Sequence, residues 1–231
     1  MEKLIIGNFK NYMTSNDVAT YLKEIEKIKG NNIVLCPSNI YIPYFLKKDF
    51  KVGIQNIASN EGTYTGEISS KQAKSLGINY AIIGHSERRI NFNETNEVVN
   101  SKIKEALKEK LNVILCIGEA IDEKDNAIEV LDKQIIECLK DIELNNIVIA
   151  YEPVWAIGTG VTPTLDDINR ITNDIKNIVQ KNYNIDIKVL YGGSVNSSNI
   201  KEIIELTDGV LIGKASTDIV EFLKIIEVVN S

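Results

Sequence analysis

The stretch Ile147-Val148-Ile149-Ala150-Tyr151-Glu152-Pro153 places a carboxylate at the end of an unbroken apolar run rich in β-branched residues. A short run without alternating polar residues indicates a strand that is buried on both faces. Pro153 fixes the backbone beside Glu152 and stiffens the start of the loop that follows. The stretch therefore predicts a buried strand that ends at a reactive side chain.

The same kind of short apolar run recurs along the chain, and segments with helical periodicity and charged faces lie between several of the runs. The second and third connections are shorter and weaker. The expected strands are Leu4–Gly7, Ile33–Cys36, Val52–Ile54, Tyr80–Ile83, Val113–Ile117, Ile147–Ala150, Val189–Tyr191 and Val210–Ile212. The clearest expected helices are Val18–Ile28, Val98–Leu107, Ile128–Leu139, Ile168–Val179 and Phe222–Val229.

Eight strands alternating with helices in 231 residues fit an α/β fold. A closed parallel (β/α)8 barrel and an open doubly wound sheet would both give this alternation. The barrel is favoured because the unusual residues follow many different strands instead of gathering at one switch point. No linker or low-complexity tract interrupts the sequence, so we expect a single catalytic domain over residues 1–231.

Charge and hydropathy limit the partners of this chain. A net charge of -6 and a pI near 5.1 argue against a nucleic-acid surface, which needs clustered Lys and Arg. No stretch approaches the roughly 18 apolar residues that span a bilayer, and the N-terminus leads into a strand instead of a signal peptide. We expect a cytoplasmic protein without a nucleic-acid or membrane partner.

The metal-binding residue types are few. Cys36, Cys116 and Cys138 lie within apolar runs and form no Cys-x-x-Cys pair, so we expect reduced packing residues. His85 is the only histidine, which makes a zinc site of His and Cys unlikely on sequence grounds. No metal or other cofactor is implied.

Three strands end at candidate catalytic side chains. Asn8 and Lys10 follow the first strand on alternate residues and could clamp an anion, or Lys10 could be a solvated turn lysine.

His85 follows the fourth strand at the start of a helical turn, and a helix N-terminus disfavours the charged imidazolium. The histidine is either structural or a neutral donor to a carbonyl or enediolate oxygen. Apolar neighbours tend to raise the pKa of Glu152 and make it a better base, although a salt-bridged rim glutamate is the alternative.

Glycine-rich turns follow the last two strands. Tyr191-Gly192-Gly193-Ser194 and Ile212-Gly213-Lys214-Ala215-Ser216 offer backbone N–H groups near helix starts. Each could be only a tight turn, but turns after strands 7 and 8 match the phosphate position common in such barrels. The Pro153–Pro163 segment, with small residues around an apolar tip, is expected to form a lid.

Four segments, in this order, resemble the triosephosphate isomerase family over nearly the whole chain: Gly7-Asn8-Phe9-Lys10, Gly84-His85-Ser86-Glu87-Arg88-Arg89, Ala150–Gly160 and Tyr191-Gly192-Gly193-Ser194. The resemblance implies interconversion of dihydroxyacetone phosphate and D-glyceraldehyde 3-phosphate, in glycolysis and gluconeogenesis, without a cofactor. It implies that Glu152 transfers the proton through an enediolate, neutral His85 polarises the carbonyl, Lys10 supplies charge and Asn8 positions the substrate. The implied donors of N–H groups to the phosphate are Gly158, Ser194, Gly213 and Lys214.

The polar connection Asn56–Ile68 is long enough to indicate a functional or partner-contacting loop. In the family, the Thr-Gly-Glu loop of one subunit reaches into the active site of the other. Thr65-Gly66-Glu67 therefore implies a homodimer formed through the Gly62–Glu67 loop, with pairing of Glu67 and Arg88 across the interface as a further hypothesis.

The chain departs from the usual pattern of the family at Phe9 (a tryptophan), Asn11 (a methionine), Val161 (a lysine) and Lys214 (the second glycine of a pair). Val161 could change the stiffness of the lid hinge. Lys214 must still present its N–H group, while its side chain either adds charge at the phosphate or points away. The sequence leaves this choice open.

Two other functions are possible on the same fold. The first is another phosphosugar-handling barrel, such as a pentose-phosphate epimerase or an indole-pathway isomerase. A metal-dependent epimerase would need carboxylate and histidine ligands, which one histidine cannot provide. A catalytically silent phosphosugar-binding protein on the same fold would be expected to have lost Lys10, His85 or Glu152. All three are present, so catalysis is favoured.

Overall fold

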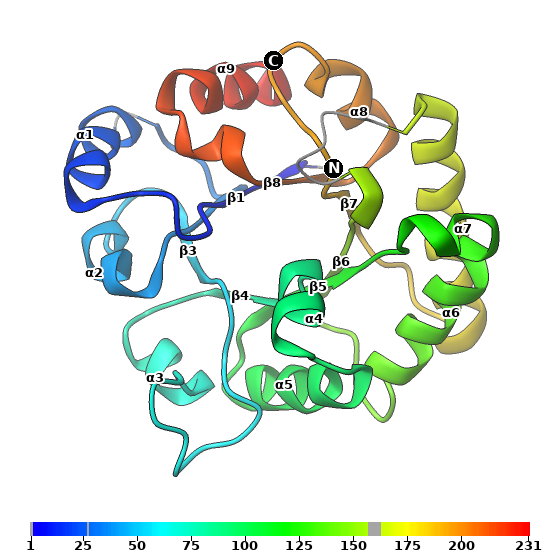
Figure 1. The fold of residues 1–231 in the computed structure, drawn as a ribbon. Coiled ribbons are helices and arrows are strands. Elements are labelled where there is room, and N and C mark those ends of the chain that lie inside the picture. Colours follow the sequence, from blue (N-terminus) through cyan, green and yellow to red (C-terminus); the bar gives the residue numbers. More distant parts are fainter. Residues whose placement is uncertain (1, 27, 157–162) are drawn as a thin grey trace.

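The strands close into a barrel in the computed structural model, which describes residues 2–26, 28–156 and 163–231. Each strand pairs in parallel with the next in sequence, and β8 pairs with β1 to complete the ring (Figure 1). This confirms the predicted (β/α)8 barrel and excludes the open sheet. The strands are β1 (Leu4–Asn8), β2 (Ile33–Cys36), β3 (Lys51–Ile54), β4 (Tyr80–Ile83), β5 (Asn112–Ile117), β6 (Ile147–Tyr151), β7 (Val189–Tyr191) and β8 (Gly209–Ile212).

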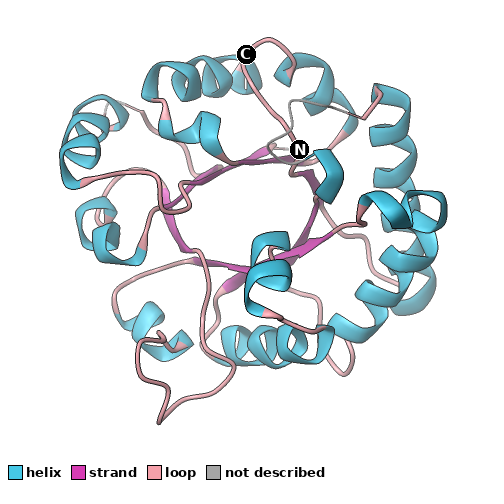
Figure 2. Cartoon of the chain, in the orientation of Figure 1, coloured by secondary structure: helices cyan, strands magenta, loops and turns pink. Residues whose placement is uncertain are grey.

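Helices surround the ring of strands on its outer side (Figure 2). Side-chain caps mark where several begin: Thr164, for example, accepts the N–H of Asp167 at 3.1 Å. The α-helices are α1 (Ser15–Ile25), α2 (Ile42–Phe45), α3 (Ser70–Ser75), α4 (Ser86–Phe92), α5 (Asn96–Lys108), α6 (Ala127–Cys138), α7 (Leu165–Tyr183), α8 (Ile200–Leu206) and α9 (Ile219–Asn230). Short 3-10 helices are η1 (Asn39–Tyr41), η2 (Ile121–Asn126), η3 (Val154–Ala156) and η4 (Lys214–Thr217).

Every expected strand lies within an observed one. The second and third connections hold only short helices, η1 and α2 in the second and α3 in the third. The expected first helix is displaced. Thr14 caps α1 in a reciprocal capping box with Asp17, so the helix begins earlier and ends at Ile25, before Ile28. The sequence pattern also does not predict α8, because seven residues are too few for a clear helical period.

Alternate residues of each strand face opposite sides of the barrel wall, and this divides the core into two parts. Residues such as Ile5 and Leu35 contact the surrounding helices, whereas Ile6 and Val34 belong to a second cluster that fills the barrel. Burial on both faces explains why the strand sequences are apolar without alternation. The barrel-filling residues are Leu4, Ile6, Val34, Cys36, Ile82, Ile114, Cys116, Ala150, Leu190 and Leu211.

Phe9, which stands where the family has a tryptophan, belongs to the outer part of the core. Its buried ring packs edge-on against Tyr21, with 5.0 Å between ring centroids, and against Phe45 at 5.7 Å. The aromatic pairs hold the end of β1 against α1 and α2. This departure therefore leaves the side chains at the barrel mouth unchanged.

Cys36, Cys116 and Cys138 are buried and unpaired, which confirms their prediction as reduced packing residues. Within the described ranges, none of the helices is both long and apolar enough to cross a bilayer.

Candidate active site

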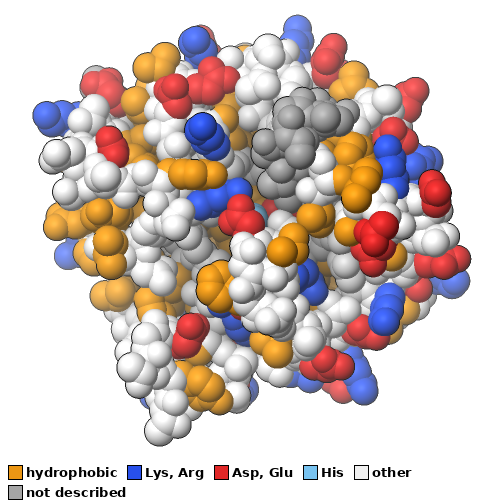
Figure 3. Space-filling model, in the orientation of Figure 1, with side chains coloured by type: hydrophobic (Ala, Val, Ile, Leu, Met, Phe, Trp, Pro, Cys, Tyr) orange, Lys and Arg blue, Asp and Glu red, His pale blue; other side chains and the backbone are white. Residues whose placement is uncertain are grey.

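The candidate site is a cavity of about 360 Å³ at the carboxyl ends of the strands. Asn8, Lys10, His85 and Glu152 line it from three different strands, together with the turns that follow β7 and β8. Figure 3 shows acidic and basic side chains gathered over the mouth of the barrel on the face that carries α4. The remaining lining residues are Tyr12, Gly192, Gly193, Ser194, Val195, Asn196, Leu211, Gly213, Lys214 and Ala215.

Glu152 and His85 are in direct contact. Oε1 of Glu152 lies 3.0 Å from Nε2 of His85, and Oε2 accepts the backbone N–H of Ser86 at 3.2 Å. Both side chains are buried, being 2% and 5% exposed as residues. The carboxylate is therefore held between an imidazole and the first N–H group of α4.

The other ring nitrogen of His85 identifies the tautomer. Nδ1 accepts the backbone N–H of Glu87 at 3.2 Å, because His85 is the N-cap of α4. A nitrogen that accepts a hydrogen bond carries no proton, so the proton of the ring lies on Nε2 and faces Glu152. This geometry assigns the tautomer of the neutral ring, and the neutrality of His85 during the reaction stays a prediction.

The contact also sets both pKa values. Burial raises the pKa of Glu152, as its sequence context predicts, but the adjacent His85 and the Ser86 N–H group lower it, and the net direction is downward. Burial lowers the pKa of His85, whereas the charge and hydrogen bond of Glu152 raise it, and the net direction is upward. The expected rise for Glu152 is therefore wrong in this geometry. If an oxygen atom of a ligand took the place of Oε1 at Nε2, Glu152 and His85 would no longer shift the pKa of each other. Burial would then lower the pKa of His85 and raise that of Glu152, which favours a neutral imidazole and a more basic carboxylate.

Lys10 reaches the site through an unusual backbone conformation. Its φ of 49° is left-handed, and the segment is held because its carbonyl accepts the hydroxyl of Ser38 at 2.7 Å and the amide of Gln55 at 2.8 Å. Its N–H donates to Oδ1 of Asn8 at 3.1 Å. The Lys10 ammonium forms an ion pair with Glu87. Asn8 and Lys10 are thus fixed relative to each other, and their role as an anion clamp stays a prediction.

The turns after β7 and β8 offer unpaired donors. Among the described residues, none accepts the backbone N–H of Ser194 or of Lys214. A Cβ atom at Gly213 would lie 3.4 Å from Cε of Lys10, so the lysine side chain passes close to this turn. Lys214 itself lines the cavity with its side chain exposed. Whether its side chain adds charge at the phosphate position or points away stays a prediction to be tested.

Gly158, Val161 and most of the expected lid lie outside the described residues. The start of this segment is described and is tied to the barrel. Nε1 of Trp155 donates to Oε1 of Glu119 at 2.9 Å, and the hydroxyl of Ser194 donates to the carbonyl of Ala156 at 3.1 Å.

Sequence reasoning overlooked the end of the fifth strand. The buried Glu119 accepts hydrogen bonds from Trp155 and, at 3.0 Å, from the hydroxyl of Tyr151. Gly118 lies so close to β6 that a Cβ atom there would be 1.7 Å from the carbonyl oxygen of Glu152. Cys116-Ile117-Gly118-Glu119 has the same signal as the other strand ends, an apolar run followed by a small and a charged residue, and could have been found by it.

No group of three or more His, Cys, Asp or Glu side chains in the described part of the chain is arranged to hold a metal ion. The polar groups that meet here are a carboxylate, an imidazole, an ammonium and backbone donors. Such a set performs proton transfer next to an anionic group. The fold and this set of groups define the class: a (β/α)8-barrel enzyme that works by acid–base catalysis.

Comparison with known proteins identifies the family within this class. Residues 3–229 match the family model described as triosephosphate isomerase. A triosephosphate isomerase of Dictyoglomus thermophilum is 42% identical over 97% of this chain and 98% of its own length. Those of Alkaliphilus oremlandii and Thermodesulfovibrio yellowstonii are each 39% identical, over 96% and 98% of this chain and 98% and 99% of theirs. The chain belongs to the triosephosphate isomerase family.

Proposed function

We propose that this chain interconverts dihydroxyacetone phosphate and D-glyceraldehyde 3-phosphate, a step of glycolysis and gluconeogenesis in the cytoplasm, with residues 1–231 acting as one catalytic domain. The observation that carries the proposal is the 3.0 Å contact between Glu152 and His85. It lies in a cavity that also holds Lys10 and the unpaired N–H groups of two turns.

Glu152 acts as the base. Its carboxylate removes a proton from the carbon next to the substrate carbonyl, and the electrons of the broken C–H bond form the enediolate. The carboxylic acid of Glu152 then returns the proton to the neighbouring carbon. Burial makes the carboxylate basic once the substrate has separated it from His85.

His85 acts on the oxygen atoms. Its Nε2–H donates to the carbonyl oxygen that gains charge and moves protons between the two enediolate oxygens. The N–H of Glu87 at Nδ1 opposes a second proton on the ring. The histidine therefore remains a neutral donor during the reaction.

The remaining groups bind and orient the substrate. Lys10 supplies positive charge near the developing oxyanion, and Asn8, which accepts the Lys10 N–H, fixes its direction. The N–H groups of Ser194, Gly213 and Lys214, with that of Gly158, bind the phosphate. None of these steps requires a metal or a cofactor.

The proposal includes a homodimer. The connection between β3 and α3, which contains the exposed segment Gly62–Glu67, projects away from the barrel (Figure 1). A hollow of about 500 Å³ lined by Lys10, His85 and Arg88 adjoins the site, and in the proposed dimer it receives the loop tip of the second copy. Within one chain Arg88 already forms an ion pair with Glu94, so Glu67 of a partner would be an additional contact for it.

The test is isomerisation of glyceraldehyde 3-phosphate by the purified protein, measured through a coupled dehydrogenase that reduces the product. We expect strong activity, and a loss of several orders of magnitude in Glu152→Asp and in His85→Gln. An inactive but folded wild-type protein that still binds phosphosugars would contradict the proposal and support the silent-binder alternative.

A further inference from the structure

Arg89 contacts the ends of two neighbouring strands, β4 and β5. Its Nε donates to the carbonyl of Gly84 at 2.7 Å, and its Nη2 lies 3.4 Å from the carbonyl of Cys116. Gly84 is the residue directly before His85, and Cys116 lies in β5, next to the strand that carries Glu152. One guanidinium thus spans the ends of β4 and β5.

The third arm of the guanidinium is fixed as well. Nη1 donates to Oδ1 of Asn96 at 2.6 Å, and Nη2 lies 3.6 Å from the sulfur of Cys138. The amide of Asn96 is itself oriented, because its Nδ2 donates to Glu137 at 2.7 Å. No ion pair between described residues includes Arg89. Its charge is therefore directed at backbone carbonyls and an amide. The planar guanidinium of arginine can donate to several such acceptors at once, whereas the ammonium of lysine cannot match this geometry.

The backbone at Gly84 is adapted to this contact. Its φ of 74° is a conformation that L side chains rarely adopt. A Cβ atom there would lie 3.0 Å from Nη2 of Arg89 and 3.2 Å from the carbonyl oxygen of Cys116. A side chain at position 84 would therefore crowd the guanidinium and strain the backbone, and the glycine turn sets the direction in which His85 leaves β4.

The other side of the contact leads to Glu152. Cys116 pairs with Ala150 and Ile117 with Tyr151 in the β5–β6 ladder, and the N–H of Glu152 donates to the carbonyl of Ile117 at 2.8 Å. A shift of the end of β5 would therefore move Glu152 by a similar amount. The distance between base and imidazole depends on how the end of β4 lies against β5. The ladder pairs Ile83 with Leu115, and Arg89 adds a link between the next residues of the two strands, Gly84 and Cys116.

We infer that Arg89 is a positioning residue that sets the separation of Glu152 and His85 by linking the carbonyls of Gly84 and Cys116. It touches neither the substrate cavity nor the reacting atoms. The inference rests on the proposed function of that pair, in which a displacement of about 1 Å can cost about 100-fold in rate.

The experiment uses Arg89→Lys, which keeps the charge but can reach fewer of the partners. We expect kcat to fall at least 10-fold with KM changed by less than 2-fold, because the phosphate turns are untouched. The histidine signal in NMR should titrate at a lower pH than in the wild type, since a looser contact with Glu152 raises the pKa of His85 less. Arg170→Lys is the matched control, because Arg170 is an exposed residue that forms ion pairs on the surface of α7.

A second variant covers the case in which Arg89→Lys does not fold. Asn96→Ala removes the support of Nη1 and leaves the two carbonyl contacts in place, so a smaller change of the same kind is expected. Lower thermal stability with unchanged kcat and unchanged histidine titration would show a purely structural role and overturn the inference. Absence of isomerase activity in the wild type would instead contradict the proposed function, while the histidine titration of the variants would still test the link.

Discussion

Nε2 of His85 lies 3.0 Å from Oε1 of Glu152, so the proposed electrophile and the proposed base share a hydrogen bond. The two groups come from β4 and β6, which are separated by β5 in the barrel. Each of them sets the pKa of the other, and the relationship can be tested on one residue because His85 is the only histidine.

The first prediction concerns the titration of His85. In the wild-type protein its pKa should lie above the ordinary 6.5, because Glu152 raises it more than burial lowers it. In Glu152→Gln the charge is gone, and burial should bring the pKa below 6.5. NMR titration of the single imidazole measures both values, and an unchanged pKa in the variant would contradict the assignment.

The same contact makes stability depend on pH. The pKa of His85 is raised on folding, so its contribution to the free energy of unfolding is fully present below pH 6.5. That contribution is lost as the pH rises through the pKa of His85 in the folded protein. The pKa of Glu152 is lowered on folding, so its contribution to the free energy of unfolding is present above pH 4.5. That contribution is lost as the pH falls through the pKa of Glu152 in the folded protein. Glu152→Gln should therefore reduce the free energy of unfolding more at about pH 5.5 than at about pH 9. Equal losses in urea unfolding at the two pH values would argue against the coupling.

Gly118→Ala should displace Glu152. The new Cβ would lie 1.7 Å from the carbonyl oxygen of Glu152, so β5 and β6 must shift apart there. We expect kcat to fall by about 100-fold, as for other small displacements of a catalytic group. Gly77→Ala is the control, since its Cβ would meet no atom within 4 Å and its positive φ costs stability alone. A kcat for Gly118→Ala equal to that of the control would disprove the displacement.

Glu119 should stabilise the start of the expected lid segment, at Trp155. Its Oε1 accepts from Tyr151 and Trp155, so Glu119→Ala removes the acceptor of the buried Tyr151 hydroxyl and one hydrogen bond of the partly buried Trp155, and should cost about 3 kcal/mol. Glu119→Gln keeps an acceptor oxygen and should cost about 1 kcal/mol or less. Trp155 is the only tryptophan, so its fluorescence during urea unfolding reports the difference. Equal losses in the two variants would rule out the hydrogen bonds as the cause.

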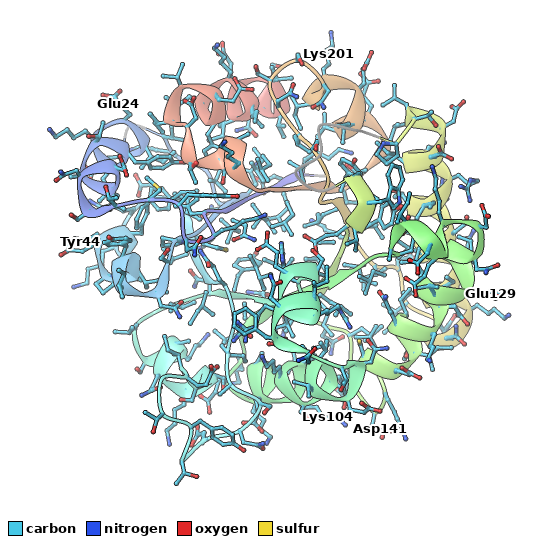
Figure 4. All side chains as sticks on the ribbon, in the orientation of Figure 1. Glu24, Tyr44, Lys104, Glu129, Asp141 and Lys201 are labelled. Carbon is cyan, nitrogen blue, oxygen red and sulfur yellow. The ribbon has the colours of Figure 1, made fainter. Side chains whose placement is uncertain are left out.

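Lys214→Met should weaken phosphate binding moderately. An exposed charge contributes up to about 1 kcal/mol, so inhibition by inorganic phosphate should weaken about 2- to 5-fold at low salt and less at high salt. Lys201→Met removes the same charge from the outer surface of α8 and is the matched control (Figure 4). If both variants bind phosphate equally well, the Lys214 side chain takes no part.

The last prediction concerns assembly. Tyr64→Asp places a charge in the exposed Gly62–Glu67 loop, where the proposed interface has to be desolvated, and should convert dimers to monomers in sedimentation velocity. Ile185→Asp, at a partly exposed apolar residue after α7, should leave the dimer intact. A wild type that sediments as a monomer would contradict the proposed homodimer.

Much of the fold was predictable because its signals are local. An apolar β-branched run such as Ile33–Cys36 has few alternatives to burial as a strand, and each expected strand was found. The start of α1 was misplaced because the capping box at Thr14 decided it, not the apolar period from Val18. The position of Glu119 after a strand follows the same local signal as the other strand ends, but its hydrogen bonds to Tyr151 and Trp155 were not predictable, because these partners are distant in the sequence.

By itself the sequence determined the barrel, the strand ends that carry Lys10, His85 and Glu152, and the family, because these depend on residue type and order along the chain. Only the tertiary structure decided that Glu152 touches His85, that Lys214 lines the cavity and that Arg89 links two strands. The reason is physical. Distances between side chains of different strands depend on barrel closure and strand register, which many residues set together.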